Sequence, residues 1–451
     1  MKEITISSTM SGNKLISTVA PPKSLRKYFI SSKLFAYYDM RIRAKRSILN
    51  IPLISTILPI AWLTGTDIHV EQLDKKYFEA INTIKKEFNQ MFPKGRFTTK
   101  IIVDDLVENK TQSQATAMLF SGGLDATYSL IKNINLKPRL IMFNGFLSFH
   151  LDPTYKKYGQ MLKKTYSDFA KREGFSINFV DANTSYILNK TRIAHDFHRI
   201  IRGNNLWLSL QEPLVLLGLP APLSIGRFNR LLIAASADPT HDYYKHPEAS
   251  QPLIDEKFAW ADLRVSHDGF IHRFEKLSLI KEYLEDHEYE ITVCNDPPPD
   301  RLNCSACEKC FRTIAPMVLN GMDPNNCGFV VNSSTFKKMR YLIENKKVNI
   351  LELVRHWIKL KTLIPREFDT TLYGSRDFFV WLKNLNIDSV QRKRNLQKHV
   401  FYLLPYFLAK VYDTCYYSVV NRSISSFSTL GKQIIKQRSI SRSFSSSQNR
   451  Y

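Results

Sequence analysis

The first residues with a chemical pattern form a glycine turn at positions 121–123. An apolar run ends at Phe120, the sequence Ser121-Gly122-Gly123 follows, and an amphipathic segment begins at Leu124. This pattern predicts a strand, a tight turn and a helix. Both glycines permit left-handed backbone angles and a close approach by a ligand. Because a helix N-terminus presents free N–H groups and a positive dipole end, the turn is suited to hold phosphate.

Polar side chains around this turn extend its chemistry. Ser121 and Thr127 supply hydroxyl donors for phosphate oxygens. Asp125 carries a negative charge that repels phosphate directly, so we expect it to hold a Mg²⁺ ion that bridges phosphates. The alternative is an ordinary strand-to-helix turn in which Asp125 only caps the helix.

Cysteines form a second pattern, because four of the six in the chain follow a C-x₉-C-x₂-C-x₂-C spacing. They are Cys294, Cys304, Cys307 and Cys310. Four thiolates satisfy a tetrahedral Zn²⁺ ion, and short C-x₂-C loops supply neighbouring ligands. Such a site has no open coordination position, so we predict a structural zinc. An iron–sulfur cluster is the alternative, because four thiolates also suit it.

A basic pair lies between these two patterns. Asp268-Gly269 suggests a hairpin turn, and a helix is expected at Lys276–Leu284. Arg273 and Lys276, at the start of that helix, can reach a phosphate or a substrate carboxylate. We take both as catalytic candidates that stabilise transition-state charge, together with Asp125. The alternative is solvated charge at a helix start.

These residues need a frame that brings distant segments together. Strands are expected at Arg139–Phe143, Ser176–Val180 and Arg230–Ala235, and helices lie between them. Strands that alternate with helices predict an α/β protein with a parallel sheet and helices on both faces. Ligands bind beyond the carboxyl ends of such strands. That rim would hold the glycine turn with Asn144 and Ser236 as nucleotide contacts, although Asn144 serves equally well as a helix cap.

The Ser-Gly-Gly-x-Asp turn resembles the signature of the PP-loop ATP pyrophosphatases. Those enzymes split ATP between its α and β phosphates and adenylate a substrate. The family usually has serine where this chain has Ala126, although Thr127 follows as in the family. The resemblance implies a five-stranded parallel sheet of the HUP-like kind, with ATP and Mg²⁺ bound at the turn.

The cysteine spacing sharpens this resemblance. A PP-loop turn followed by four cysteines is similar to the 7-cyano-7-deazaguanine synthases of queuosine biosynthesis and their synthase-like paralogues. Those synthases convert a deazaguanine carboxylic acid to a nitrile with ATP and ammonia, and they carry a structural zinc. The wording Cys307-Glu308-Lys309-Cys310 looks closer to the paralogues. The resemblance covers Thr116 to Pro324, under half of the chain, and implies a small-molecule or nucleobase substrate.

Composition divides the rest of the chain. Residues 1–110 are expected to form a small α+β domain, 111–330 the ATP-binding domain with its zinc site, 331–420 a helical extension and 421–451 a mobile serine-rich tail. Strand-like segments lie at Glu3–Ser7, Lys14–Val19 and Lys33–Tyr38, and a helix is expected at Leu73–Met91. The apolar stretch Ile48–Leu63 is too short for a bilayer and predicts a buried helix, broken or kinked at a proline.

The net charge of +23 predicts attraction to nucleic acid or to an acidic partner. A solvated basic surface with a basic tail is the alternative. The tail, residues 421–451, has six lysines or arginines and no acidic residue. The N-terminal residues lack the apolar core of a signal peptide, and six cysteines are too few for a disulfide scaffold. These features predict a cytoplasmic protein without a transmembrane segment.

The leading functional hypothesis is an ATP-dependent ligase that adenylates a carboxylate or carbonyl oxygen and then transfers nitrogen. A PP-loop sulfur transferase acting on tRNA would need a reactive cysteine near the nucleotide, and no cysteine precedes Cys294. A third hypothesis is a nucleotide-binding interaction protein without turnover, which Ala126, the extra domains and the basic tail motivate.

Overall fold

The computed structural model describes residues 3–143, 153–201, 205–294, 297–345, 348, 354–365, 372–387 and 402–411. The chain divides into two compact units, Met1–Thr292 and Val293–Tyr451. The domain boundaries that the sequence suggests near residues 110, 330 and 420 stay predictions. Asn144 and the tail 421–451 lie outside the described residues.

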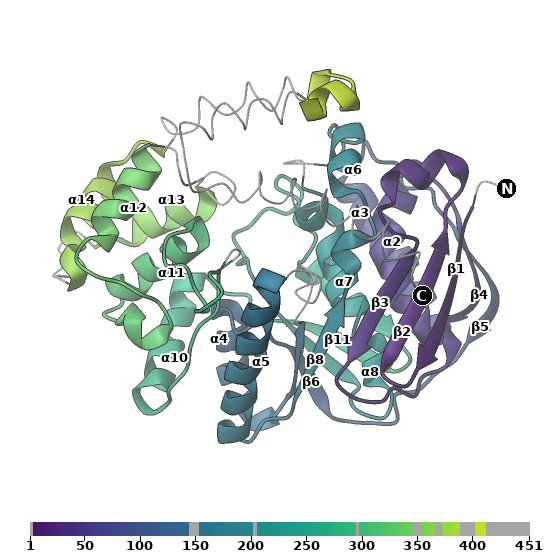
Figure 1. The fold of residues 1–451 in the computed structure, drawn as a ribbon, viewed down its shortest axis with the longest axis horizontal. Coiled ribbons are helices and arrows are strands. Elements are labelled where there is room, and N and C mark those ends of the chain that lie inside the picture. The colour runs from purple at the N-terminus through teal and green to yellow at the C-terminus, as the bar shows by residue number, and fades with distance from the viewer. Residues whose placement is uncertain are drawn as a thin grey trace. The chain divides into compact units, whose positions relative to one another are not determined.

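The strands of the described residues form one mixed sheet in the first unit (Figure 1). Their order across the sheet is β10-β11-β9-β6-β7-β8-β3-β2-β1-β4-β5. Six neighbouring pairs are parallel and four are antiparallel. The strands are β1 (Ile4–Ser11), β2 (Lys14–Ala20), β3 (Lys33–Tyr38), β4 (Ile68–Asp74), β5 (Ile101–Val107), β6 (Thr116–Leu119), β7 (Arg139–Phe143), β8 (Ile177–Ala182), β9 (Arg230–Ala234), β10 (Ala259–Trp260) and β11 (Leu263–Asp268).

Five adjacent strands, β11, β9, β6, β7 and β8, run parallel to one another. Numbered along the chain from β6, their spatial order read from β8 is 3-2-1-4-5. The expected strands at 139–143, 176–180 and 230–235 are confirmed as β7, β8 and β9. The strand β11 was not predicted. The expected hairpin at Asp268-Gly269 is wrong, because Asp268 ends β11, which pairs with β9 in parallel.

The N-terminal strands extend this sheet rather than building a second one. The strand β3 pairs antiparallel with β8, so the parallel set is one part of a larger mixed sheet. The strands expected at 3–7, 14–19 and 33–38 are confirmed as β1, β2 and β3. The expected helix at 73–91 begins two residues later, because Asp74 accepts a hydrogen bond from the Tyr77 amide at 2.9 Å and caps it.

Helices lie on both faces of the parallel strands. The helices of this unit are α1 (Arg46–Leu49), α2 (Ile51–Thr64), α3 (Lys75–Met91), α4 (Leu124–Lys132), α5 (Pro153–Glu173), α6 (Lys190–Asp196), α7 (Glu212–Gly218), α8 (Ala221–Ser224), α9 (Pro252–Asp255) and α10 (Arg273–Asp286). Asp268 of β11 accepts from Lys132 Nζ of α4 at 2.9 Å. The preceding His267 points to the opposite face, where its Nδ1 lies 2.7 Å from Asp255 of α9. Alternation along one strand thus separates two helical layers.

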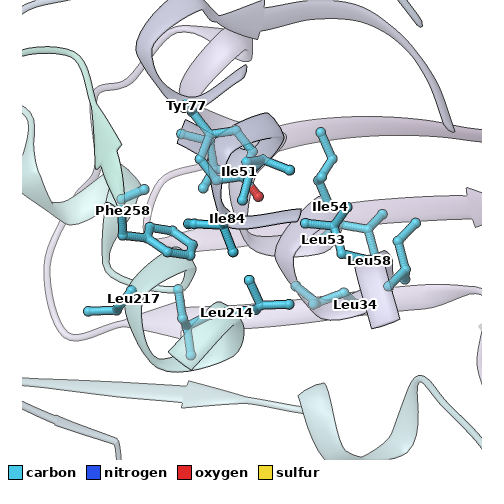
Figure 2. Close-up of a cluster of buried hydrophobic side chains, with 14 of the residues drawn as sticks. Leu34, Ile51, Leu53, Ile54, Leu58, Tyr77, Ile84, Leu214, Leu217 and Phe258 are labelled. Atoms are coloured by element: carbon cyan, nitrogen blue, oxygen red, sulfur yellow. The ribbon is translucent and has the colours of Figure 1, made fainter. Parts of the chain in front are cut away.

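The core of this unit is centred on α2, whose apolar side chains are buried on all sides. Figure 2 shows it between β3, α3 and α7, with Leu34, Ile54, Tyr77, Ile84, Leu214 and Phe258 in one cluster. The expected buried helix is therefore confirmed. The stretch is divided at Asn50, where α1 gives way to α2 with Pro52 in its first turn, whereas α2 runs through Pro59 without a break.

The second unit is helical beyond the cysteines. Its helices are α11 (Glu308–Leu319), α12 (Thr335–Glu344), α13 (Val354–Leu363) and α14 (Arg376–Asn384). Phe336 of α12 packs against Phe378 and Phe379 of α14, with ring centroids 5.3 and 5.7 Å apart. The expected helical extension is confirmed, although α12 was not predicted. None of the helices in the described ranges is long and apolar enough to cross a membrane.

Candidate functional site

The glycine turn lies where the order of the parallel strands reverses. From β6 the chain passes to β7 and β8 on one side, and it later returns to β9 and β11 on the other. In open parallel sheets, ligands bind beyond the carboxyl ends of the strands at such a point. Ser121, Gly122 and Gly123 follow the carboxyl end of β6, between β6 and α4.

The backbone of the turn requires glycine at position 122. Gly122 has a φ of +70°, a left-handed value that other residues rarely adopt. A Cβ atom added there would lie 1.9 Å from the hydroxyl oxygen of Tyr166. At Gly123 the φ is −77° and the closest atom to an added Cβ is 3.1 Å away. The backbone conformation therefore requires glycine at position 122 but not at position 123.

Tyr166 and Tyr289, whose ring centroids are 6.1 Å apart, contact the glycine turn and the start of α4 and are called the tyrosine wall below. The Tyr166 hydroxyl lies 3.3 Å from the Gly122 carbonyl, 2.9 Å from the Glu290 carbonyl and 2.7 Å from Thr292 Oγ1. The Thr292 amide donates to the Gly122 carbonyl at 2.8 Å. Burial raises the pKa of Tyr166 well above its usual value, so the hydroxyl keeps its proton as a donor. These bonds join the glycine turn to Tyr166 of α5 and to residues 290–292 after α10.

The two hydroxyl residues of the turn have different environments. Ser121 is exposed, and its Oγ accepts from the Gly123 amide at 3.2 Å. Thr127 is buried, and its hydroxyl lies 2.9 Å from both the Gly123 carbonyl and the Tyr289 hydroxyl. Ser121 is therefore available to a ligand, whereas the Thr127 hydroxyl holds the first turn of α4 against the tyrosine wall.

Asp125 joins the first turns of two helices. It lies in the first turn of α4 and forms ion pairs with Arg273 and Lys276 in the first turn of α10. The Lys276 Nζ lies 2.9 Å from Asp125 Oδ1, and Arg273 binds the other carboxylate oxygen. Asp125 does not cap α4, whose N-cap is Gly123 without a side-chain bond. The three catalytic candidates thus meet at one point.

The charges of this cluster are largely removed from water. The side chains of Asp125, Arg273 and Lys276 are 16%, 13% and 1% exposed. Burial alone would raise the pKa of Asp125, but the charges of Arg273 and Lys276 outweigh it and lower that pKa, so the carboxylate stays ionised. The cluster carries one net positive charge. The Arg273 Nε is buried without a hydrogen-bond partner in the described part of the chain, which leaves a donor for a ligand.

Lys276 also connects this cluster to the predicted contact at β9. Its Nζ donates to the Ala235 carbonyl at 2.6 Å, and the exposed Ser236 follows directly. The Ala235 amide in turn donates to the Asp268 carbonyl at 2.7 Å, which joins the ends of β9 and β11. The structure therefore places Ser236 beside the Asp125 cluster, at the same rim as the glycine turn.

The expected Mg²⁺ site at Asp125 does not fit this arrangement. Both carboxylate oxygens already bind a cationic side chain. A divalent cation prefers several free oxygen ligands, and the neighbouring ammonium and guanidinium groups would repel it. In this structure Asp125 acts as a counter-ion that orients Arg273 and Lys276.

In the second unit, the four predicted cysteines converge. Their Sγ atoms all lie within 4.8 Å of one another, and the close pairs are 3.5 Å (Cys307–Cys310), 3.8 Å (Cys304–Cys310) and 3.9 Å (Cys294–Cys307) apart. Tetrahedral zinc with Zn–S bonds of about 2.3 Å separates its sulfurs by about 3.8 Å. The cluster can therefore hold one zinc ion. An iron–sulfur cluster, which places irons and sulfides between the thiolates, needs a wider spacing.

Backbone amides and a buried asparagine hold these ligands in place. The Cys307 amide lies 3.2 Å from Cys304 Sγ, and the Cys310 amide lies 3.5 Å from Cys307 Sγ. Asn303 Oδ1 accepts from the Cys294 amide at 3.3 Å, and its Nδ2 donates to the Gly328 carbonyl at 2.9 Å. Such contacts orient metal ligands before the metal binds.

The sequence reasoning missed the tyrosine wall and Asn303. Tyr166 lies in the middle of an amphipathic helix, where an aromatic residue is typical of packing and gives no sign of a polar contact. Asn303 precedes a zinc-type cysteine pair, and that position was the only available signal.

Compared with protein-family models, with curated proteins and with solved structures, the chain gives no match.

Proposed function

We propose that this chain is an ATP-dependent ligase of the PP-loop type, which adenylates a carboxylate or carbonyl oxygen and transfers nitrogen to the activated carbon. One observation carries the proposal. A glycine turn that requires Gly122 lies at the reversal point of five parallel strands, and Arg273 and Lys276 are held beside it. The resemblance of the turn and the cysteines to the 7-cyano-7-deazaguanine synthases supports the same reaction class.

The reaction divides into two steps in this proposal. The acceptor oxygen attacks the α phosphate of ATP, the bond to the β phosphate breaks, and pyrophosphate leaves. Ammonia then attacks the activated carbon, AMP leaves with the acceptor oxygen, and a proton is released from nitrogen. In this proposal Asp125 does not bind Mg²⁺, because both of its oxygens are engaged by Arg273 and Lys276.

The residues of the chain supply position and charge. The free amides of α4 and the Ser121 hydroxyl bind phosphate oxygens at the turn. The Arg273 Nε donor and the Lys276 ammonium stabilise the charge that develops on the leaving pyrophosphate. Asp125 keeps both cations at the rim when no nucleotide is bound. A zinc ion held by Cys294, Cys304, Cys307 and Cys310 would stabilise the fold around them and take no part in the reaction.

The test is a pyrophosphate-release assay with a matched pair of variants on α10. Purified full-length chain is incubated with ATP, ammonium and candidate aromatic carboxylic acids, and AMP and pyrophosphate are quantified. Lys276→Met should lower turnover at least about a hundredfold, because it removes a buried cation from the developing charge. Lys281→Met changes an exposed lysine on the same helix and should leave turnover unchanged. Equal effects of the two variants would contradict the assigned role.

A second candidate function is a nucleotide-binding protein without turnover. Two observations favour it: Ala126 stands where the family has serine, and the Thr127 hydroxyl is engaged inside the protein. Such a protein would bind ATP at one site per chain and release no pyrophosphate with any acceptor. Isothermal titration with ATP, followed by the release assay on the same sample, separates the two candidates.

A further inference from the structure

A second polar region lies at the amino ends of the parallel strands, whereas the glycine turn lies at their carboxyl ends. A cavity of about 430 Å³ is lined by Arg43, Lys45, Lys110, Ile48 and Ile225, among others. These residues come from the segment after β3, the segment between β5 and β6, and the segment before β9. Because β3 is antiparallel to β8, its end lies beside the start of β8, at the amino ends of the parallel strands.

The charge in this cavity is not balanced by its own residues. Among the residues that the structure describes, Arg43, Lys45 and Lys110 form no ion pair. Glu108 is the acidic residue of the lining, and its Oε1 already binds Lys75 Nζ at 2.7 Å. The hydrogen bond from Lys75 lowers the pKa of Glu108, with a smaller contribution from Lys110. The three cations Arg43, Lys45 and Lys110 therefore line the cavity without a free carboxylate, because Lys75 already neutralises Glu108.

Two partly buried arginines extend this surface. Arg227 donates to the carbonyls of Ile225 at 2.9 Å and Arg41 at 3.2 Å, and Arg139 donates to Asn178 Oδ1 at 3.1 Å. Burial and the nearby charge of Arg139 lower the pKa of Arg227, and Asp39 offsets this in part. Neither arginine pairs with a carboxylate in the described ranges. Asp39 lies nearby but forms no ion pair with either arginine in the described ranges, so the two arginines keep an excess of positive charge that favours an anionic ligand.

We propose that this basic strip, defined as Arg41, Arg43, Lys45, Lys110, Arg139 and Arg227, binds the phosphate backbone of a nucleic acid. Its cations come from separate segments and lie along the amino ends of neighbouring parallel strands, as expected for contact with successive phosphates. Ile48 and Ile225 in the lining of the cavity give apolar surface that suits the sugar or base of one nucleotide. The six cations of the tail account for only six of the 23 net positive charges, so most of the excess lies elsewhere.

A nucleic acid fits this surface better than the other polyanions do. A membrane surface is flat and is usually met by exposed large apolar side chains, and the large apolar residues of the lining, Ile48 and Ile225, do not belong to the exposed set. The basic strip is separate from the glycine turn, because the two lie at opposite ends of the same strands. The inference therefore does not depend on the proposed function.

The experiment compares two triple variants that remove the same charge from the full-length chain. The first is Arg43→Ala with Lys45→Ala and Lys110→Ala. The control is Lys86→Ala with Lys94→Ala and Lys100→Ala, which are exposed lysines on α3 and in the segment before β5. Fluorescence anisotropy measures binding of a labelled 20-nucleotide single-stranded RNA, the matching duplex and unfractionated tRNA, each across a salt titration.

The first variant should bind at least tenfold more weakly than the wild type at about 0.1 M salt. Its slope of log affinity against log salt should fall by about two for a single strand, since each lost phosphate contact contributes about 0.7. The control variant should keep most of the affinity. Stronger loss with the single strand than with the duplex would assign the cavity to an unpaired nucleotide.

Three outcomes would overturn the inference. They are equal weakening by both triple variants, no binding of any nucleic acid by the wild type, and binding of anionic phosphatidylserine vesicles in place of RNA. ATP turnover measured on the same variants keeps the two proposals apart. An inactive wild type that binds RNA through the basic strip refutes the ligase alone, and an active wild type without such binding refutes the strip alone.

Discussion

The two polar centres of this protein are assembled in opposite ways. The cysteine centre uses ligands from one stretch of chain, residues 294–310, and it is held by amides of the same stretch and by Asn303. The centre at the glycine turn joins Asp125 to Arg273, which lies 148 positions later in the chain, and to Lys276, which lies 151 positions later. One centre depends on local spacing, and the other depends on how the sheet folds.

This difference determines how each centre responds to damage. A metal site loses its binding energy when one ligand is removed, because the remaining thiols cannot complete the coordination. A charge cluster built on rigid helices keeps its backbone when one side chain changes, but it leaves the other charges unpaired. The predictions below test whether the two centres behave in these two ways.

The largest effect is expected at the cysteine centre. Wild-type protein should contain about one zinc per chain, and Cys307→Ser should lose it. Structural zinc contributes on the order of 10 kcal/mol of apparent folding free energy in small zinc domains, so residues 293–345 should lose protection from hydrogen exchange. Elemental analysis and hydrogen exchange with mass spectrometry measure the two results.

The matched control for this variant is Cys327→Ser. Cys327 is buried, but it lies outside the four-cysteine cluster, and its Sγ lies 3.7 Å from the Asp323 carbonyl. It should keep its zinc and lose little stability. Iron with sulfide in the wild-type protein would show that the sulfur spacing has been interpreted wrongly.

The next effect is expected from Asp125→Asn. Both cations would lose their counter-ion, and breaking such a buried pair costs about 3–5 kcal/mol. Turnover should fall at least about a hundredfold because Arg273 and Lys276 would no longer be oriented. Chemical denaturation and the pyrophosphate assay measure the two quantities. Turnover near the wild-type rate would remove Asp125 from the catalytic group.

The same variant predicts a dependence on pH. Burial alone would raise the pKa of Asp125 in the folded protein. The charges of Arg273 and Lys276 outweigh burial and lower this pKa below its ordinary value of about 3.9. Its ionised form therefore stabilises the fold above pH of about 4, and this contribution is lost as the pH falls further. The stability difference between wild type and Asp125→Asn should shrink between about pH 5 and pH 2. A constant difference would contradict the ion pairs.

A smaller effect separates the two glycines of the turn. Gly122→Ala should destabilise the protein by about 2–4 kcal/mol and abolish ATP binding, because the new Cβ meets Tyr166 at a φ of +70°. Gly123→Ala is the matched control, since its φ is ordinary and its nearest atom is 3.1 Å away. Urea unfolding and ATP titration compare them. Equal tolerance of both changes would refute the described turn.

The contrast between the centres also explains what could be predicted from the sequence. The cysteine ligands were predicted because a C-x₂-C spacing alone constrains where the sulfur atoms go. Strands β7, β8 and β9 were predicted because each is a short apolar run beside a helical period. Strand β11 was missed although Leu263–Asp268 alternates polar and apolar residues, because the Asp-Gly pair at its end was interpreted as a hairpin turn.

Side-chain partners across long separations could not be predicted. Asp125 was expected to hold Mg²⁺, and its ion pairs with Arg273 and Lys276 were not expected. Thr127 was expected to face phosphate, but its hydroxyl binds Tyr289, 162 positions later. No local pattern contains such a pairing. The pairing of β3 with β8 could not be predicted for the same reason, since these two strands are far apart in the sequence and meet only in the folded protein.

The tyrosine wall should give an effect of about 1–3 kcal/mol. Tyr166→Phe keeps the ring and leaves Thr292 Oγ1 and two carbonyls without their shared donor. ATP affinity should fall in parallel, because the turn would be held less firmly. Tyr244→Phe is the control, since Tyr244 is 48% exposed and its hydroxyl lies 3.4 Å from Gln90. If both variants behave alike in urea unfolding, the wall does not support the turn.

The smallest effect is expected from Ser121→Ala. The side chain is exposed and makes one weak hydrogen bond with the Gly123 amide, so stability should change by less than about 0.5 kcal/mol. ATP affinity should nevertheless fall about fivefold, which corresponds to about 1 kcal/mol for one lost phosphate contact. Titration calorimetry with ATP measures this, and the melting temperature serves as the control. Unchanged affinity would show that Ser121 only shapes the turn, and phosphate recognition would then rest on the amides of α4 and on the two cations that Asp125 orients.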